Sequence, residues 1–180
     1  MEFSDLLTKE HKAIRRALDV LRTMIDQVEQ RIPTDRHDVN ALLLFLHYFG
    51  DACHQAKEES ILFPALKSSE KFASSVEPES LLGGHNEERG LIETAQLALF
   101  TDKQDEFIAS ARKVVDLLSE HVDKEEHVLF PLAERILTRE QANEVTMRLQ
   151  EADAKFGFTQ RKLLLDMLDH LEDKYIRKAA

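Results

Sequence analysis

Apolar residues recur at steps of three and four along most of the chain, which is the spacing of one face of an α-helix. The first run of this kind extends from about Ser4, a predicted N-cap, to a break at Pro33. The second run begins at Thr34 or Asp35. It is expected to end or kink near Pro64, because the residue before a proline disfavours helical geometry.

Two more helical runs follow a loop expected at about residues 67–78, which is rich in Ser, Lys and Glu. The third run spans about residues 81–99. The fourth begins at the sequence Thr-Asp-Lys-Gln of residues 101–104, interpreted as a capping box, and is expected to stop at Pro131. Four amphipathic helices with short connections predict an up-down-up-down four-helix bundle.

Two further helices are predicted in the C-terminal part of the chain. One begins at a second capping box, residues 138–141, and ends with Gly157 as its C-cap, and the other spans about residues 160–177. The predicted fold class is therefore all-α, with a metal-binding bundle over residues 1–135 and a helical extension over residues 136–180. The extension is expected to pack on the bundle or on a partner subunit. Packing on a partner subunit would make the protein a homodimer.

Composition narrows the possible partners and the compartment. The chain has 34 acidic and 24 basic residues, a net charge of −10, which argues against nucleic acid or an anionic membrane as a partner. No apolar run approaches the roughly 20 residues that cross a bilayer, and the N-terminus lacks the order of charges of a signal peptide. A single cysteine, Cys53, excludes an internal disulfide and fits a reducing cytoplasm. We therefore expect a cytoplasmic protein.

One motif occurs twice. Residues 54–64 read HQAKEESILFP and residues 121–131 read HVDKEEHVLFP, so both contain a His, a Lys-Glu-Glu and a closing Leu-Phe-Pro. Each copy is preceded by a helix that has a lone His, His11 or His85, four residues before an Arg. The chain is therefore interpreted as two copies of one helical hairpin. The Leu-Phe-Pro tails are interpreted as packing the bundle end and terminating helices.

The paired motifs place four imidazoles and two carboxylates on inward helix faces, since residues four apart in a helix are neighbours. A single His on such a face is more often a hydrogen-bonded core residue than a ligand. A buried carboxylate without a partner is costly, however, and a cation would offset that cost. The predicted ligands of a two-metal site are His11, His54, Glu58, His85, His121 and Glu125.

A seventh ligand is predicted at Glu88, three residues after His85 on the same inward face. Arg89 is expected nearer the edge of that face. A carboxylate at position 88 either binds metal or pairs with a neighbouring Arg, and the alternative is an exposed position at the rim of the bundle. We favour the ligand, because it would add negative charge that stabilises ferric iron.

These histidines and the two His-x-x-x-Glu pairs, with their Lys-Glu-Glu and Leu-Phe-Pro surroundings, resemble the hemerythrin-like, His-His-Glu cation-binding family over about residues 4–135. The resemblance implies a four-helix bundle that holds two iron ions as a non-haem centre, oxo- or hydroxo-bridged, with both Glu carboxylates bridging. Oxygen-carrying hemerythrins have a further His at the position of Arg89. This departure argues against reversible oxygen carriage.

Several functions stay open at the level of sequence. Imidazole and carboxylate ligands suit iron, manganese or zinc, and the lack of cysteine ligands argues against a purely structural zinc site. One hypothesis is an enzyme of the stress response that decomposes hydrogen peroxide or reacts with nitric oxide. The alternative is a module that stores or senses oxygen or iron without turnover, and a weaker one is a structural zinc or manganese bundle.

Overall fold

The computed structural model describes residues 2–73 and 84–177, and all regular structure within these ranges is helical. The first part of the chain forms α1 (Phe3–Glu29), α2 (Arg36–Phe45), the π-helical segments η1 (Leu46–Gln55) and η2 (Glu58–Leu62), α3 (Phe63–Lys67) and α4 (Glu70–Ala73). The second part forms α6 (His85–Phe100), α7 (Gln104–Lys124), the π-helical η3 (Glu125–Leu129), α8 (Phe130–Ile136), α9 (Arg139–Phe156), α10 (Phe158–Glu172) and the π-helical η4 (Asp173–Arg177).

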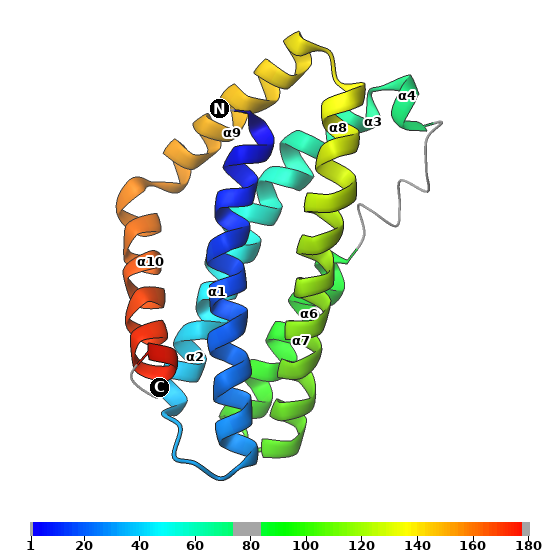
Figure 1. The fold of residues 1–180 in the computed structure, drawn as a ribbon. Helices are drawn as coiled ribbons and strands as arrows, with labels where there is room; N and C mark the ends of the chain where they lie inside the picture. Colours follow the sequence, from blue (N-terminus) through cyan, green and yellow to red (C-terminus); the bar gives the residue numbers. More distant parts are fainter. Residues whose placement is uncertain (1, 74–83, 178–180) are drawn as a thin grey trace.

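Four long helical paths alternate in direction (Figure 1). In that view α1 descends, the path from α2 to α3 returns, α6 descends, and the path from α7 to α8 returns. Helix α7 packs against α1 and α6, while η1 packs against α1 and α6 from the other side. The predicted start of the third helix near residue 81 lies outside the described residues, as do residues 74–78 of the loop predicted before it. The described part of that loop includes the short helix α4, so the loop prediction is wrong there.

The predicted N-terminal caps of three helices can be compared with the structure; two of these predictions are wrong and one is confirmed. Helix α1 is capped at Glu2 rather than Ser4, and the Glu2 amide donates a hydrogen bond to Asp5 Oδ2 at 3.0 Å. Helix α7 is capped at Lys103 rather than at Thr101. The Thr101 hydroxyl donates instead to the Leu97 carbonyl of α6, the helix before it. The capping box at residues 138–141 is confirmed.

Both Leu-Phe-Pro tails continue as helix, so the predicted stop at Pro131 is wrong, and of the two alternatives at Pro64, an end or a kink, the end is wrong. The π-helical segments η2 and η3 end immediately before each Phe-Pro pair. Each proline therefore sits in the first turn of a new α-helical segment, where its missing N–H needs no intrahelical partner. The predicted packing role of the tails is confirmed, because their Leu and Phe side chains are buried.

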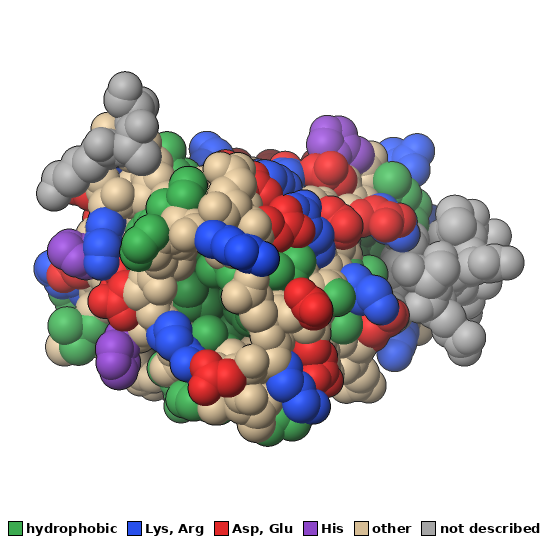
Figure 2. Space-filling view, turned by 90° about the horizontal axis from the view of Figure 1, so that it is seen from below, with side chains coloured by type: hydrophobic (Ala, Val, Ile, Leu, Met, Phe, Trp, Pro, Cys, Tyr) green, Lys and Arg blue, Asp and Glu red, His purple; other side chains and the backbone are tan. Residues whose placement is uncertain are grey.

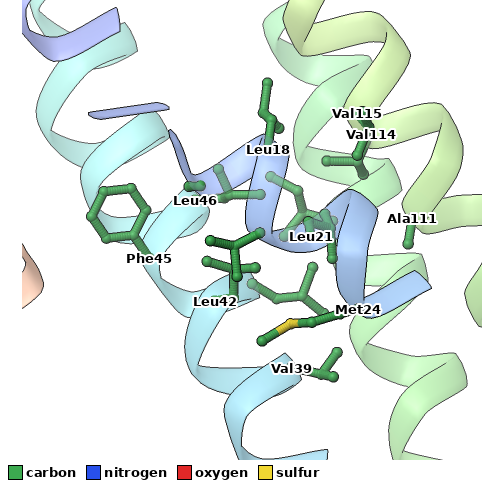
Figure 3. Packing of buried hydrophobic residues seen from close by; sticks show 14 of the residues in the cluster. Leu18, Leu21, Met24, Val39, Leu42, Phe45, Leu46, Ala111, Val114 and Val115 are labelled. Carbon is green, nitrogen blue, oxygen red and sulfur yellow. The ribbon is translucent and has the colours of Figure 1, made fainter. Parts of the chain in front are cut away.

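Two apolar clusters fill the interior, one on each side of a polar level. The larger cluster includes Leu18, Leu21 and Met24 of α1, which meet side chains of α2 and α7 (Figure 3). The smaller cluster contains Leu7 and the Leu and Phe side chains of both Leu-Phe-Pro tails. Because Leu7 belongs to one cluster and Ile14 to the other, the turn of α1 that carries His11 lies between them.

The C-terminal helices pack on the bundle: α9 slants across its end near the N-terminus, and α10 lies alongside it (Figure 1). Helix α9 contacts α1 and η2, and α10 contacts α1 and α2 (Figure 1). Gly157 joins them with a φ of 98°, a conformation that favours glycine, and its predicted capping role is confirmed. Within the described ranges, no helix is both long and apolar enough to cross a membrane.

The bundle end opposite α9 is hollowed. Viewed from that end, hydrophobic side chains gather in a central depression surrounded by charged groups (Figure 2). A pocket of about 290 Å³ lies there, lined by residues that include Val28, Ile32, Val39, Leu99 and Phe107. This pocket lies at the far end of α1 from His11 and shares no residue with the polar level between the two clusters.

Candidate metal centre

Each of the four helical paths contributes one histidine to the polar level between the apolar clusters, and all four imidazoles are buried. Two fully buried glutamates accompany them, at the first positions of η2 and η3. These side chains form two groups whose ligand atoms lie within 4.8 Å of one another: His11, His54, Glu58 and Glu125, and Glu58, His85, His121 and Glu125. Glu58 and Glu125 belong to both groups.

The histidines of each group face each other through their Nε2 atoms. The separation is 3.0 Å between His11 and His54 and 3.1 Å between His85 and His121. Two nitrogens bound to one metal at a right angle, with bonds of about 2.1 Å, would lie about 3.0 Å apart. The spacing in both groups therefore fits a shared cation.

The opposite ring nitrogen, Nδ1, of every one of these histidines meets a carboxylate. The Nδ1 of His11, His54 and His85 hydrogen-bonds a glutamate at 2.9, 3.0 and 2.7 Å. Because an ionised carboxylate only accepts hydrogen bonds, each of these three Nδ1 atoms is the donor, and in a neutral ring this leaves Nε2 as a free lone pair. Facing lone pairs repel each other unless a cation lies between them. The partners, in chain order of the histidines, are Glu126, Glu10, Glu59 and, at 3.2 Å from His121, Glu88.

The two shared glutamates lack partners of their own. Among the described residues, neither oxygen of Glu58 or Glu125 has a partner in hydrogen-bond geometry, although His Nε2 atoms lie 3.0 to 3.4 Å away. Burial and the charge of Glu125 raise the pKa of Glu58 well above its usual range. Burial also opposes ionisation of Glu125, but the adjacent His11 and His121 outweigh it and lower its pKa. Burial lowers the pKa of His54 to about 4, so that its ring is neutral at pH 7.

This donor set fits a metal. It offers imidazole lone pairs and unpartnered carboxylate oxygens in a dry interior, where a cation would balance the carboxylate charge. All six residues of the predicted two-metal site lie in the two groups.

The repeated motif also orients the lone histidines, a role that was not predicted from the sequence. The second Glu of each Lys-Glu-Glu holds the lone His of the other hairpin: Glu126 bonds His11, and Glu59 bonds His85. The Arg four residues after each lone His then donates to the same glutamate, Arg15 to Glu126 at 3.0 Å and Arg89 to Glu59 at 2.6 Å. Both copies thus form an Arg–Glu–His chain. The shared His-x-x-x-Arg and Lys-Glu-Glu spacings were the signal for it.

Glu88 points inward as predicted, with 1% of its surface exposed, so the exposed rim alternative is wrong. Its Oε1 lies 3.2 Å from His121 Nδ1, and its Oε2 accepts a hydrogen bond from the amide of Gln55. It belongs to neither of the two groups, and its assignment as a ligand stays a prediction. Arg89 lies at the edge, as expected, and pairs with Asp51 and Glu59.

A small cavity of about 10 Å³ adjoins the centre, on the order of the space that one water molecule occupies. Its polar wall consists of Asp51, His54, Gln55, Glu88, Arg89 and His121. The apolar wall comes from residues of four helical segments: Ile14, Leu46, Ile92, Leu118 and Val122. Only a molecule of a few atoms fits beside the centre.

Comparison with known proteins agrees with this site. The family model described as the Hemerythrin HHE cation binding domain matches residues 2–133, which include all four histidines and every glutamate that contacts them. No curated protein and no solved structure gives a significant match. The match covers well over half of the 180 residues. The chain therefore belongs to the hemerythrin HHE cation-binding family.

Proposed function

We propose that this chain is a non-haem di-iron protein built on a four-helix bundle. His11 and His54 hold one iron, His85 and His121 hold the other, and Glu58 and Glu125 bridge them. The observation that carries the proposal is the convergence of facing imidazole Nε2 atoms and two unpartnered carboxylates into two groups with both carboxylates in common. Iron in such a site supplies redox chemistry and open coordination positions for dioxygen, hydrogen peroxide or nitric oxide.

The residues around the centre select the reactant by size. The apolar wall excludes bulk water, and the adjoining cavity of about 10 Å³ admits only a few atoms. Burial raises the pKa of Glu88, which lines this cavity together with Gln55. The Gln55 amide donates to Glu88 Oε2 and fixes the orientation of this carboxyl group at the cavity wall.

Reaction is favoured over reversible oxygen carriage. A guanidinium stays charged and offers no lone pair to a metal, so Arg89 cannot replace the additional histidine of an oxygen carrier. Arg89 is committed to ion pairs with Asp51 at 2.7 Å and Glu59 at 2.6 Å. Arg89 therefore adds no ligand on the side of His85 and His121.

The test is to purify the protein in air, measure its metal content and then add hydrogen peroxide or nitric oxide. We expect about two irons per chain, a visible absorption band of a bridged pair, and either gas evolution from peroxide or consumption of nitric oxide. A stable coloured oxygen adduct that reverses under vacuum would instead identify a storage or sensing module. Zinc or manganese in place of iron, without turnover, would identify a structural bundle.

A further inference from the structure

A buried ion cluster links the C-terminal helices to His54. Glu10 accepts the His54 Nδ1 proton through Oε2 at 3.0 Å. Its other oxygen, Oε1, accepts from Lys57 Nζ at 2.5 Å and from Arg161 Nη1 at 2.6 Å. Asp153 then accepts from the same two cations, at 2.6 Å from Lys57 and 3.1 Å from Arg161. Two cations and two anions thus form one closed network.

The network joins the family domain to the chain that follows it. Asp153 lies in α9 and Arg161 in α10, both beyond the matched residues 2–133. The Glu10 side chain is 1% exposed and that of Lys57 is 5% exposed. Without a partner such groups would be costly to bury, so Lys57 and Glu10 depend on each other and on the two extension residues.

The other half of the centre has no such network in the part of the chain that the structure describes. Gly84 occupies the position that corresponds to Glu10, one residue before the lone histidine. Its φ is 119°, a conformation that residues with a side chain rarely adopt, and a Cβ built there would be in van der Waals contact with Glu88 Oε1 at 3.4 Å. Lys124, the counterpart of Lys57, is 54% exposed and pairs with Glu120.

We propose that Asp153 and Arg161 are positioning residues of the metal centre. They hold Glu10 as the acceptor of the His54 Nδ1 proton, and so fix the direction in which His54 presents its Nε2. The metal position of His11 and His54 is therefore the tighter of the two. This inference rests on the proposed two-metal function and adds to it that the C-terminal helices set the affinity of one half.

The physical argument is one of orientation. A carboxylate on the far nitrogen fixes the tautomer and ring angle of a ligand histidine, and removing such a partner lowers metal affinity about 10–100-fold. With Arg161 absent, Lys57 alone would serve both Glu10 and Asp153, and Glu10 would lose one of the two donors that fix its Oε1. We expect the resulting loss of affinity to be about 10-fold, the lower end of that range.

The experiment titrates cobalt(II) into metal-free wild-type protein and variants, followed by calorimetry and visible absorption. Wild type is expected to bind two ions in distinguishable steps. Arg161→Gln and Asp153→Asn should weaken the tighter step and leave the weaker step unchanged, and Arg161→Lys should restore most of the loss. Arg16→Gln is the matched control, because Arg16 joins α1 to α10 through Asp169 and Glu172 without touching Glu10.

A double-mutant cycle of Arg161→Gln with Glu10→Gln completes the test. If Arg161 acts through Glu10, Arg161→Gln has no further effect on the tighter step once Glu10 is changed. Additive effects, an equal loss in Arg16→Gln, or unchanged binding in Arg161→Gln would each overturn the positioning proposal alone. A wild-type protein that binds fewer than two ions would overturn the di-iron function and the positioning proposal together.

Discussion

At the scale of a residue, Glu58 is where the proposed metal centre should affect stability most directly. Burial and the adjacent Glu125 raise its pKa, so the metal-free protein must bury a strained carboxyl pair. Glu58→Gln removes that strain, and we expect the metal-free variant to unfold at the same temperature as wild type or higher. The rise in unfolding temperature on adding iron(II) should largely disappear, since metal binding contributes to folding.

Thermal unfolding with and without iron(II) measures both effects of Glu58→Gln. Glu120→Gln is the control, because Glu120 is 63% exposed and pairs only with Lys124 among the contacts described. It should keep the full response to iron. A Glu58→Gln protein that keeps the full iron response and two bound irons would contradict the assignment of Glu58 as a bridge.

Replacing Glu88 distinguishes two roles that a buried carboxylate can have here, as a metal ligand or as the group that orients His121. A ligand would change the visible spectrum of the iron-loaded protein when replaced, whereas a residue that orients His121 would change affinity alone. The sequence favours Glu88 as a ligand, whereas the position of its Oε1 beside Nδ1 of His121 rather than Nε2 favours the orienting role, for which Glu88→Gln should lower iron affinity about 10–100-fold. At saturating iron the occupancy and spectrum should be those of wild type. A changed spectrum at full occupancy would support Glu88 as a ligand.

The sequence predicted which six residues come together between the helices, but not the groups that orient them. Periodicity identifies which side chains face inward, and the duplicated motif identified the four histidines and two glutamates. Glu59 and Glu126 each lie one residue beyond an inward glutamate, where the pattern predicts a helix edge. Their role depends on contacts across two hairpins, which a one-dimensional spacing does not specify.

At the scale of elements, two threonines that looked alike in sequence differ in structure. Thr138 accepts a hydrogen bond from the Gln141 amide at 3.2 Å, and its own amide donates to the Gln141 side chain at 2.9 Å. We expect Thr138→Ala to lower the free energy of unfolding by about 1 kcal/mol. Thr101→Ala should cost less than about 0.5 kcal/mol, since the Thr101 hydroxyl caps no helix start. Urea denaturation of both variants tests this, and equal losses would contradict it.

The Leu-Phe-Pro tails show why the ends of these helices could not be predicted from the sequence. The rule that a helix ends before a proline is local, and it assumes an uninterrupted α-helical hydrogen-bond ladder. Here the Phe63 and Phe130 amides bond the Glu58 and Glu125 carbonyls across wider π-helical turns. Those turns begin at the two shared glutamates, and π-helical turns are often found at functional sites. The irregularity that defeated the prediction thus coincides with the metal centre.

At the scale of the whole molecule, the C-terminal helices share the bundle's core. Leu168, Leu171 and Tyr175 belong to the same apolar cluster as the interior of α1, α2 and α7. An apolar stripe in the sequence shows that a helix needs a partner surface but does not identify which one. The sequence therefore left packing on the bundle and packing on a second subunit equally open.

Tyr175 joins the end of the chain to the start of α2. Its hydroxyl donates to Asp38 Oδ2 at 2.7 Å, and Lys174 donates to the same oxygen at 2.5 Å. We expect Tyr175→Phe to lower the free energy of unfolding near neutral pH by about 1.5–3 kcal/mol, the range for a hydrogen bond to a charged group. Tyr48→Phe is the control, since Tyr48 is 44% exposed.

The same contact predicts a pH dependence. Burial and the hydrogen bond to Asp38 raise the pKa of Tyr175 from 10.0 to about 12. A group whose folded pKa lies above its unfolded pKa stabilises the fold fully below the unfolded value, and that contribution is lost as the pH rises through the folded value. Denaturant titrations between pH 10 and about 12 should therefore show wild type losing more stability than Tyr175→Phe. Parallel losses in the two proteins would mean that Tyr175 ionises as readily in the folded chain as in the unfolded one, and that the C-terminal segment is not docked through this hydroxyl.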